Sequence, residues 1–458
     1  MLARMLRPLL LLAALLGGLA AQEPPNVILV VTDDLGWGDL GCYGQRTLKT
    51  PVLDRMAREG RRFTDFYAGS TVCAPSRCVL MTGQHTGHCL IRGNGKQNLR
   101  PEDVTLAEVL KPASYATGLF GKWGIGHEGS DGLPTRQGFD RFYGYLDQHH
   151  AHNYYPTFLV RGEKRVALKN VVEKEGRWGQ GVASKKVEYS HDLITKEALR
   201  FIDDHRARRF FLCVTWTLPH ANNEAGRRGM EIPDLGPFAK ESWPEPAKGF
   251  AAMVARIDRD MGRLLDRLRK HGIDENTLVL FTSDNGPHSE GGHKSKTFNS
   301  SGPLKGQKRS LHEGGIRVPM IARWPGRIPA GTTSAQVAGF QDLLPTFARI
   351  GGATANVPRD IDGVSIASSL LEATPKIVPR SLYWAFYEGR GGQAVRNGRW
   401  KAVQQPYHTK VRLYDLKDDI GEQHDLAAKR PKLVAKLSEI MKQSYAPSDR
   451  WKFKPRRR

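Results

Sequence analysis

The feature that most constrains the fold is a set of short apolar runs that each end abruptly in polar residues. Residues 26–32 are Asn-Val-Ile-Leu-Val-Val-Thr, and Asp33 and Asp34 follow directly. Residues 277–283 have the same character and precede Asp284. Continuous apolar and β-branched runs of this length are typical of strands buried on both faces, which occur in parallel sheets covered by helices. The sequence therefore predicts interior strands of an α/β domain.

Segments with helical periodicity separate the apolar runs. Further strands are predicted at 116–120, 210–216 and 318–323, and the segment 149–184 is predicted to be a long loop with hairpin character. The alternation predicts a mostly parallel central sheet flanked by helices, in which ligands bind outside the carboxyl ends of the strands. The predicted helices are 51–60 with Thr50 as N-cap, 105–112 with a capping box from Thr105 to Glu108, 190–204, and 249–271.

The pattern changes in the last part of the chain. Short strand-like segments at 382–387, 393–395, 400–404 and 411–415 alternate with turn residues, and they precede an amphipathic segment at 431–444. This order predicts a small antiparallel sheet with a helix packed on it. We therefore expect a large α/β domain over residues 22–375 and a C-terminal subdomain over residues 376–458.

The N-terminal segment resembles a targeting sequence rather than part of the fold. Arg4 and Arg7 precede an apolar run at 9–16, and small residues follow. This series predicts a secretory signal peptide over residues 1–21. The alternative is an uncleaved anchor, but the run is shorter than the ~20 residues that a membrane span needs. We expect an exported protein, periplasmic or secreted, without stable membrane insertion.

Charge and cysteine content bear on partners. The formal net charge is +22, from 69 Lys and Arg against 47 Asp and Glu. A basic surface attracts polyanions, which outside the cytoplasm are sulfated or acidic polysaccharides rather than nucleic acid, or it is simply a solvated surface. The count of 5 cysteines is odd, so at least one is unpaired, and the other four have three possible pairings or none.

The segment from Cys73 to Arg77, Cys-Ala-Pro-Ser-Arg, combines three features of an anion site. Pro75 suits the first position of a helix, which would leave the backbone N–H groups of Ser76 and Arg77 unpaired and available to an oxyanion. The same helix terminus would lower the pKa of a nearby thiol. The guanidinium of Arg77 can bind two oxygens of a tetrahedral anion.

Four oxygen-bearing side chains follow the two most apolar strands. Carboxylates this close together repel unless a cation lies among them, and an all-oxygen set suits Ca²⁺ or Mg²⁺ better than Zn²⁺. Either pair alone is also compatible with the capping of a turn. Because the pattern occurs twice, each time directly after a buried strand, we predict a metal site. Its predicted ligands are Asp33, Asp34, Asp284 and Asn285.

Three other strand-end or loop residues have suitable chemistry for the same site. Lys122 and His220 follow predicted strands, and Lys308 lies in a Gly-rich loop. Taken singly, each is also compatible with an ordinary structural or surface role. The histidines at positions 149, 150 and 152 form either a metal site, a substrate-facing loop or a plain surface.

Together these segments resemble the type I sulfatase family. The segment Cys73-Ala-Pro-Ser-Arg77 with Thr82-Gly83 is similar to the family signature. The similarity extends over nearly the whole mature chain in the family's order and is strongest to the arylsulfatase branch. The other similar segments are 31–44, Gly121-Lys122-Trp123, Pro219-His220, 283–286, 308–319, and 413–422.

The resemblance implies an alkaline-phosphatase-like fold and a formylglycine-dependent mechanism. Cys73 would be oxidised by a formylglycine-generating enzyme, and the aldehyde hydrate would attack sulfur. One Ca²⁺, held by Asp33, Asp34, Asp284 and Asn285, would also contact the modified residue 73. The resemblance implies that Arg77, Lys122 and Lys308 hold the hydrate and the sulfate, and that His220 helps to protonate the leaving alcohol.

The chain departs from the family pattern at one position. The family usually has a histidine two residues after the catalytic lysine, and Gly124 stands there instead. The substitute for that histidine is His127 from a shifted loop, Asp33, or water, and we include His127 among the predicted catalytic residues.

The sequence thus predicts a sulfatase that cleaves sulfate esters, with a sulfated sugar or an aryl sulfate as substrate. Rival hypotheses are a two-zinc phosphatase or phosphodiesterase on a related fold, a polyanion-binding protein with an inactive site, and a cysteine hydrolase that uses the thiol of Cys73. Loops 85–94, 145–157 and 287–303 are expected to select the substrate. The predicted substrate-binding residues on these loops are Arg92, His152 and His288.

Overall fold

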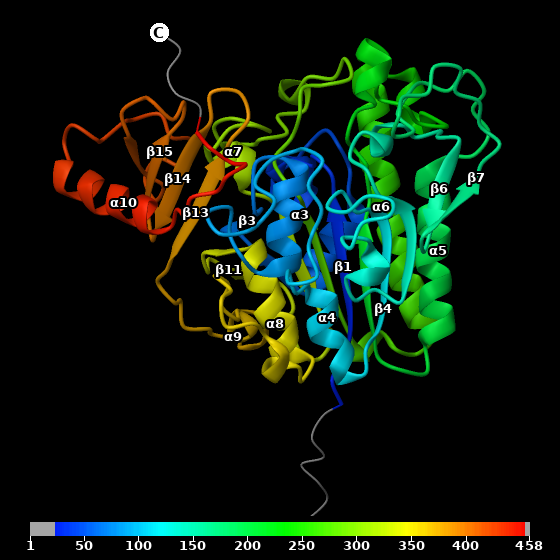
Figure 1. Cartoon of the computed structure of the whole chain (residues 1–458), viewed down its shortest axis with the longest axis horizontal. Coiled ribbons are helices and arrows are strands. Elements are labelled where there is room, and N and C mark those ends of the chain that lie inside the picture. Colours follow the sequence, from blue (N-terminus) through cyan, green and yellow to red (C-terminus); the bar gives the residue numbers. More distant parts are fainter. Residues whose placement is uncertain (1–22, 454–458) are drawn as a thin grey trace, which may run out of the picture.

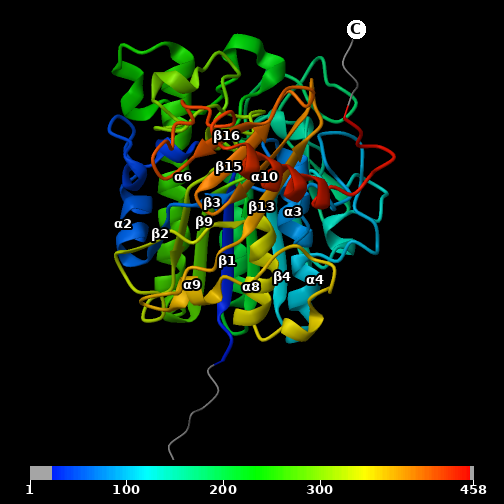
Figure 2. The same cartoon turned by 90° about the vertical axis from the view of Figure 1, so that its left-hand side faces the viewer.

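The computed structural model describes residues 23–453 as a large mixed sheet with helices on both faces and a smaller sheet beside it (Figures 1 and 2). The expected signal peptide lies outside the described residues. The strands are β1 Asn26–Thr32, β2 Arg61–Phe63, β3 Phe66–Tyr67, β4 Ala116–Lys122, β5 Arg141–Tyr145, β6 Phe158–Arg161, β7 Lys164–Ala167, β8 Phe210–Thr215, β9 Thr277–Ser283, β10 Met320–Arg323, β11 Thr332–Ser334, β12 Ala338–Gly339, β13 Ser381–Phe386, β14 Gly392–Asn397, β15 Trp400–Gln404 and β16 Arg412–Asp415.

Nine α-helices cover these sheets in the described part of the chain. Short 3₁₀ turns connect several of them. The helices are α2 Pro51–Glu59, α3 Cys73–Thr82, α4 Leu106–Leu110, α5 Ser190–His205, α6 Glu245–Lys270, α7 Glu313–Ile316, α8 Leu343–Ile350, α9 Ala367–Leu371 and α10 Pro431–Gln443.

The large sheet confirms the predicted α/β class. Its strand order is β11-β2-β10-β9-β1-β8-β4-β5-β6-β7. The central strands β9, β1, β8, β4 and β5 are all parallel, and β10 and β6 run antiparallel to their neighbours at the two sides. Helices lie in the connections from β1 to β4, from β5 to β8 and from β8 to β9, and they cover both faces of the sheet.

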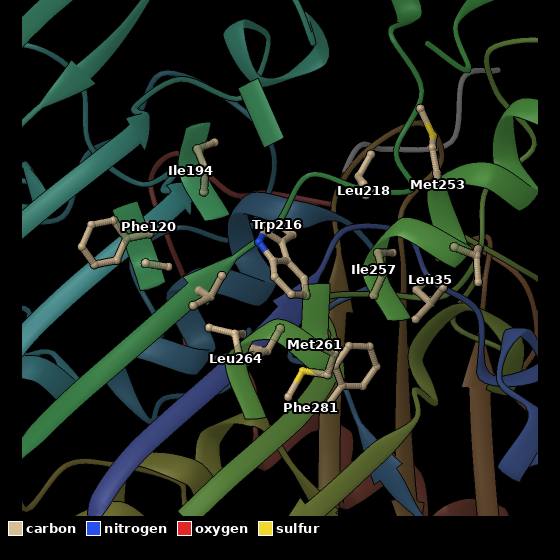
Figure 3. Packing of buried hydrophobic residues seen from close by; sticks show 14 of the residues in the cluster. Leu35, Phe120, Ile194, Trp216, Leu218, Met253, Ile257, Met261, Leu264 and Phe281 are labelled. Atoms are coloured by element: carbon tan, nitrogen blue, oxygen red, sulfur yellow. The ribbon is translucent and has the colours of Figure 1, made fainter. Parts of the chain in front are cut away.

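Alternation along β1 divides the interior into two cores. Ile28 and Val30 face one core, which includes Met261 and Leu264 of α6, and Leu29 faces the other. Figure 2 shows α2 and α6 on one side of the sheet and α3 and α4 on the other. Figure 3 shows the first core, where the apolar face of α6 meets Trp216 at the end of β8. Full burial of one such side chain contributes about 1.5–3 kcal/mol, which anchors α6 firmly on the sheet.

The C-terminal segment forms the predicted small antiparallel sheet. Its order is β13-β14-β15-β16, and α10 packs on one face through Leu437 and Met441. Figure 1 shows this sheet and α10 at one side of the large sheet. Residues 158–167 within the predicted long loop form the hairpin of β6 and β7.

Two predictions about helix starts were wrong in detail, and a third was right. Thr105 forms the predicted capping box with Glu108. Thr50 does not cap α2 with its side chain, because its hydroxyl instead accepts from the N–H of Gly41. Helix α3 begins at Cys73, so Pro75 is its third residue, and the N–H of Ser76 is already bonded to the carbonyl of Val72.

Two further expectations concern membranes and disulfides. Over residues 23–453, no helix has both the length and the apolar character that crossing a bilayer requires. All five cysteines lie in this range, and each is a free thiol, so none of the possible pairings is formed.

Candidate active site

Strand register brings the predicted carboxylates together. Thr32 of β1 is the partner of Ser283 of β9, so the residues that follow these strands emerge side by side. The N–H of Asp284 donates to the carbonyl of Thr32 at 2.9 Å, and the N–H of Asp34 donates to Asp284 Oδ1 at 3.3 Å. Asp34 has a φ of 66°, a left-handed conformation that is uncommon for a non-glycine residue and that recurs at functional sites.

The acidic cluster is completely buried. Asp33, Asp34, Asp284 and Asn285 each have no exposed surface. Burial and the neighbouring charge of Asp33 raise the pKa of Asp284 to about 7. The amide nitrogen of Asn285 donates to Asp34, whereas its oxygen is buried without a hydrogen-bond partner. An oxygen without a hydrogen-bond partner, beside carboxylates that repel one another, is the kind of ligand atom that a bound cation satisfies.

Three buried cations balance these three carboxylates. Arg77 Nη2 donates to Asp284 Oδ2 at 2.7 Å, while its Nη1 donates to the carbonyl of Lys122 at 2.6 Å. Lys122 Nζ lies 2.6 Å from Asp33 Oδ2. Lys308 Nζ lies 2.8 Å from Asp34 Oδ2. Lys122 reaches the cluster from the end of β4 and Lys308 from the loop before α7, and both ammonium groups contact its carboxylates.

Cys73 stands at the first position of α3, next to this cluster. Its Sγ lies 3.4 Å from Asp33 Oδ1, and it is 3% exposed. Burial and then Asp33 raise the pKa of its thiol well above the ordinary value. The expectation of a lowered pKa was therefore wrong, because desolvation and the adjacent carboxylates oppose the thiolate more strongly than the helix terminus favours it.

His220 follows β8 and contacts the buried cation Lys308. Its Nδ1 lies 2.7 Å from the carbonyl of Ala221, which can only accept, so Nδ1 carries the proton. Its Nε2 then accepts from Lys308 Nζ at 3.1 Å. Burial and the charge of Lys308 keep the pKa of His220 well below its ordinary value. In this structure both ring nitrogens of His220 are hydrogen-bonded, and the role of proton donor that the resemblance implies stays a prediction.

A cavity of about 470 Å³ opens above Cys73. Its wall includes Cys73 and residues from five other segments of the chain. The lining residues are Cys73, Asn94, Gly95, Lys96, Asp147, Gln148, His149, His152, Trp178, His220, Asn223, Glu224, Lys308 and Arg309.

His127 is held away from the cluster. Its Nδ1 lies 2.6 Å from Asn98 Oδ1 and its Nε2 lies 2.9 Å from Asp147 Oδ2, so both ring nitrogens are engaged. At Gly124, with φ of 80°, an added Cβ would lie 2.1 Å from the amide nitrogen of Gln148. Gln148 therefore fills the space beside the position where relatives are expected to carry a histidine, and the structure does not bring His127 there.

The three expected substrate-binding residues have different surroundings. His152 lines the cavity, and its ring stacks on His220 with centroids 4.9 Å apart. His288 is buried behind His220 and lies 3.0 Å from the carbonyl of Pro219. Arg92 donates to the carbonyls of Cys89 and Ala446 and lines a separate cavity, so it does not reach this site. Of the histidines 149, 150 and 152, only His150 is buried away from the cavity.

Sequence reasoning missed several residues of the site. Glu290 lies 3.1 Å from Lys308 Nζ, and Glu224 lies 3.1 Å from His152 Nδ1. Asn94 accepts the N–H of Ala74 at 3.0 Å and so caps α3 from a distant loop. These residues lie in loops without a periodic pattern or a strand end to mark them, so no sequence signal singled them out.

Fold and site together define a hydrolytic enzyme of the alkaline-phosphatase-like class, with its reactive residues at the carboxyl ends of parallel strands. Residues 25–353 match the family model described as Sulfatase, and residues 306–446 match the model described as N-sulphoglucosamine sulphohydrolase, C-terminal.

Relatives along almost the whole chain agree with these matches. Arylsulfatase A of Homo sapiens is 35% identical over 490 residues, which cover 94% of this chain and 90% of the relative. N-acetylgalactosamine-6-sulfatase of Sus scrofa is 33% identical, and the match covers 86% of this chain and 74% of the relative. The crystal structure of Ps i-CgsB in complex with k-i-k-neocarrahexaose has a TM-score of 0.76 at 27% identity, covering 92% of this chain and 93% of that one. The chain belongs to the sulfatase family, and it is a hydrolase of sulfuric esters.

Proposed function

We propose that the protein is an exported, calcium-dependent sulfatase that removes sulfate from carbohydrates through a formylglycine derived from Cys73. Two relatives support the carbohydrate substrate, since the name of one specifies N-acetylgalactosamine 6-sulfate chemistry and the structure of another contains an oligosaccharide. We further propose that residues 22–375 form the catalytic domain and 376–458 the C-terminal subdomain, with loops 145–157 and 287–303 selecting the sugar.

The residues present fit one calcium ion. The observation that supports this most strongly is the unpartnered buried oxygen of Asn285 beside three buried carboxylates. Asp33, Asp34, Asp284 and Asn285 would hold the ion, since Ca²⁺ prefers oxygen ligands. An ion there would also favour the charged form of Asp284, whose pKa is otherwise raised to about 7.

The modified residue would supply the nucleophile, an oxygen of an aldehyde hydrate, and the ion would neutralise part of the negative charge of sulfate. The side chains of this chain supply the rest. Arg77 is fixed by the carbonyl of Lys122 and the carboxylate of Asp284, so its charge is already oriented before substrate binds. Lys122 uses one of its three donors on Asp33, which leaves two for a sulfate oxygen or for residue 73.

The cysteine hydrolase hypothesis is disfavoured by the surroundings of Cys73. A thiol nucleophile acts as its thiolate, and burial together with Asp33 raises the pKa of this thiol. The same carboxylates favour an uncharged precursor that is converted to a neutral aldehyde hydrate. The geometry therefore supports Cys73 as a precursor of the nucleophile.

One experiment tests the proposal. The chain is co-expressed with a formylglycine-generating enzyme, and the peptide that contains residue 73 is analysed by mass spectrometry while an aryl sulfate and an aryl phosphate are assayed. We expect the aldehyde and turnover of the sulfate in preference to the phosphate. An unmodified thiol with no sulfatase activity would contradict the proposal.

Two controls accompany this experiment. Cys73→Ser should reduce sulfate turnover by at least about 10³-fold, because the side chain that carries the nucleophile is lost. Cys213→Ser changes a buried thiol of β8 that the proposed chemistry does not use, and its activity per folded molecule should remain close to that of the parent. Equal losses in both variants would point to misfolding rather than chemistry.

A further inference from the structure

One cation that lines the proposed substrate cavity has no carboxylate partner in the described part of the chain. The cavity wall includes the Lys and Arg side chains Lys96, Lys308 and Arg309. Lys308 pairs with Asp34, and Arg309 pairs with Glu290. Lys96 is exposed, and no carboxylate of the described residues lies within ion-pair distance of its ammonium group. Its charge is therefore available to a ligand of the cavity.

Trp178 lies in the same cavity wall and contacts two cations of this kind. The ammonium nitrogen of Lys96 lies 5.4 Å from the centroid of the indole ring, and the guanidinium carbon of Arg177 lies 5.1 Å from it. Arg177 is also exposed and has no carboxylate partner among the described residues. Attraction between a cation and an aromatic face orders both side chains, although their like charges repel each other. An anion bound to both cations would offset this repulsion.

The C-terminal subdomain fixes the loop that carries Lys96. Trp451 Nε1 donates to the carbonyl of Leu90 at 2.9 Å and to Gln97 Oε1 at 2.8 Å, so one indole joins both ends of the loop. The ring also packs on Gly93, where an added Cβ would lie 2.6 Å from it. Because the path of the loop is fixed before a ligand binds, less conformational entropy is lost on binding.

We propose that Lys96 and Arg177, ordered by Trp178, bind a second anionic group of the substrate, an inference that rests on the sulfatase function proposed above. The substrate is then a carbohydrate that carries a sulfate ester or a carboxylate in addition to the sulfate that is cleaved. Oxygens of either group accept charge-assisted hydrogen bonds from an ammonium and a guanidinium. Cys73 and Lys96 line one cavity, so one ligand of that cavity can contact both.

The test compares sugars that differ in the second anionic group, using the complete, formylglycine-bearing enzyme. The panel contains monosulfates of N-acetylgalactosamine, N-acetylglucosamine and galactose, the corresponding disulfates, and disaccharides that join each monosulfate to glucuronate or, as the neutral control, to glucose. Each sugar is assayed as a substrate and as a competitive inhibitor of 4-nitrophenyl sulfate hydrolysis. We expect a preference of at least about tenfold for the disulfates or for the glucuronate disaccharides, which identifies the second group as sulfate or carboxylate.

Variants of the two cations assign this preference to the proposed residues. Lys96→Gln should raise KM for the preferred sugar about tenfold, while kcat for that sugar and kcat/KM for 4-nitrophenyl sulfate stay within about twofold of the parent. Lys96→Arg keeps the charge and should keep the preference, and Arg177→Gln should raise KM about threefold. Lys164→Gln removes an exposed lysine of β7 that does not line the cavity, and it should leave these constants unchanged.

Trp451→Phe tests the positioning role of the C-terminal subdomain. The variant keeps an aromatic ring on Gly93 but removes the N–H that bonds both ends of the loop. KM for the preferred sugar should rise about threefold with kcat nearly unchanged, because Lys96 is held less exactly. Equal changes for the preferred sugar and for 4-nitrophenyl sulfate would show that Trp451 does not act through Lys96.

The outcomes separate this inference from the proposed function. A parent enzyme inactive on 4-nitrophenyl sulfate and on every sugar sulfate would overturn the proposed function itself. An active parent that shows no preference for a second anionic group, including one that binds none of these sugars, would overturn the anion subsite and leave the sulfatase function intact. The same conclusion would follow if Lys96→Gln kept the preference of the parent.

Discussion

The strand-end cluster around Asp284 and the cluster around Glu313, where α7 meets the C-terminal sheet, both bury carboxylates against Lys and Arg. Glu313 receives hydrogen bonds on both oxygens, from Lys401 at 2.7 Å and from Tyr67 at 2.7 Å, and Arg317 lies 3.0 Å away. Although burial opposes ionisation, these cations lower the pKa of Glu313 to about 2. Asp284 is equally buried, yet its pKa is raised to about 7.

The difference shows which cluster is complete by itself. The protein supplies every partner that Glu313 needs, so this cluster joins the large domain to the small sheet. Around Asp284 the carboxylates compete for the same cations, and the oxygen of Asn285 has no partner. A buried carboxylate that the protein does not satisfy is characteristic of a site that a ligand completes.

Neutralising Asp284 gives the largest effect on activity that we predict. Asp284→Asn removes a proposed calcium ligand and the anchor of Arg77, so kcat/KM for an aryl sulfate should fall by about 10³-fold. The free energy of unfolding in chelator at neutral pH should not fall, because this carboxyl is poorly stabilised without the ion. Steady-state kinetics and urea unfolding measure the two quantities, and a large loss of stability with normal activity would contradict the comparison.

Neutralising Glu313 should have the opposite outcome. Glu313→Gln leaves the buried charges of Lys401 and Arg317 with only Glu422 and Asp65 as partners, and breaking a buried ion pair typically costs about 3–5 kcal/mol. The expected result is a lower free energy of unfolding in urea with turnover per folded molecule within about threefold of the parent. A variant with the same free energy of unfolding as the parent would mean that Glu313 is not needed to stabilise this cluster.

Removal and return of calcium should act on one cluster alone. Chelation should abolish turnover, and added Ca²⁺ should restore it and raise the Tm of the parent, because a ligand that binds only the folded state stabilises it. Glu313→Gln should show the same rise in Tm, and Asp284→Asn should show little or none. Differential scanning fluorimetry with Mg²⁺ as the competing ion checks both ion dependence and ion choice.

The two carboxylates should also give stability profiles of opposite slope against pH. The folded pKa of Asp284, about 7, exceeds the unfolded value of 3.8, so its contribution is present below about pH 4 and is lost as pH rises through 7 in calcium-free buffer. The folded pKa of Glu313, about 2, lies below the unfolded value of 4.5, so its contribution is present above about pH 4.5 and is lost as pH falls towards 2.

Urea unfolding between pH 2 and 8 in chelator measures these slopes. Asp284→Asn should remove the fall in stability towards neutral pH, and excess Ca²⁺ should suppress it in the parent. An unchanged slope in the variant would show that a group other than Asp284 causes the fall in stability towards neutral pH.

The smallest predicted effect concerns the start of α3. Asn94→Ala removes the acceptor for the N–H of Ala74, and the loss of such a cap costs about 1 kcal/mol. Because α3 carries residues 73 and 77, turnover should fall only a fewfold, through less exact placement of these residues. Thr105→Ala removes a comparable cap on α4 and is the matched control, with a similar loss of stability and unchanged kinetics.

The sequence alone determined the layered α/β fold and the polar residues at its strand ends. Each apolar run is buried on both faces, so hydrophobicity and β-branching marked the strands, and the residues directly after them could be placed at one edge. Local signals were less reliable for helix starts, since the hydroxyl of Thr50 accepts from Gly41 instead of capping α2 and Pro75 is the third residue of α3 rather than its first. A cap depends on which side chain or carbonyl lies nearby in three dimensions, and for α3 that partner is Asn94.

Only the tertiary structure decided which side chains share the site. The register of Thr32 with Ser283 sets the two acidic segments side by side, and a shift of one residue would move the side chains of the whole strand to the other face. Loop paths, which no periodicity records, directed Arg92 to another cavity and placed Gln148 beside Gly124. They also brought Glu224 next to His152, although the two residues are 72 positions apart in the sequence.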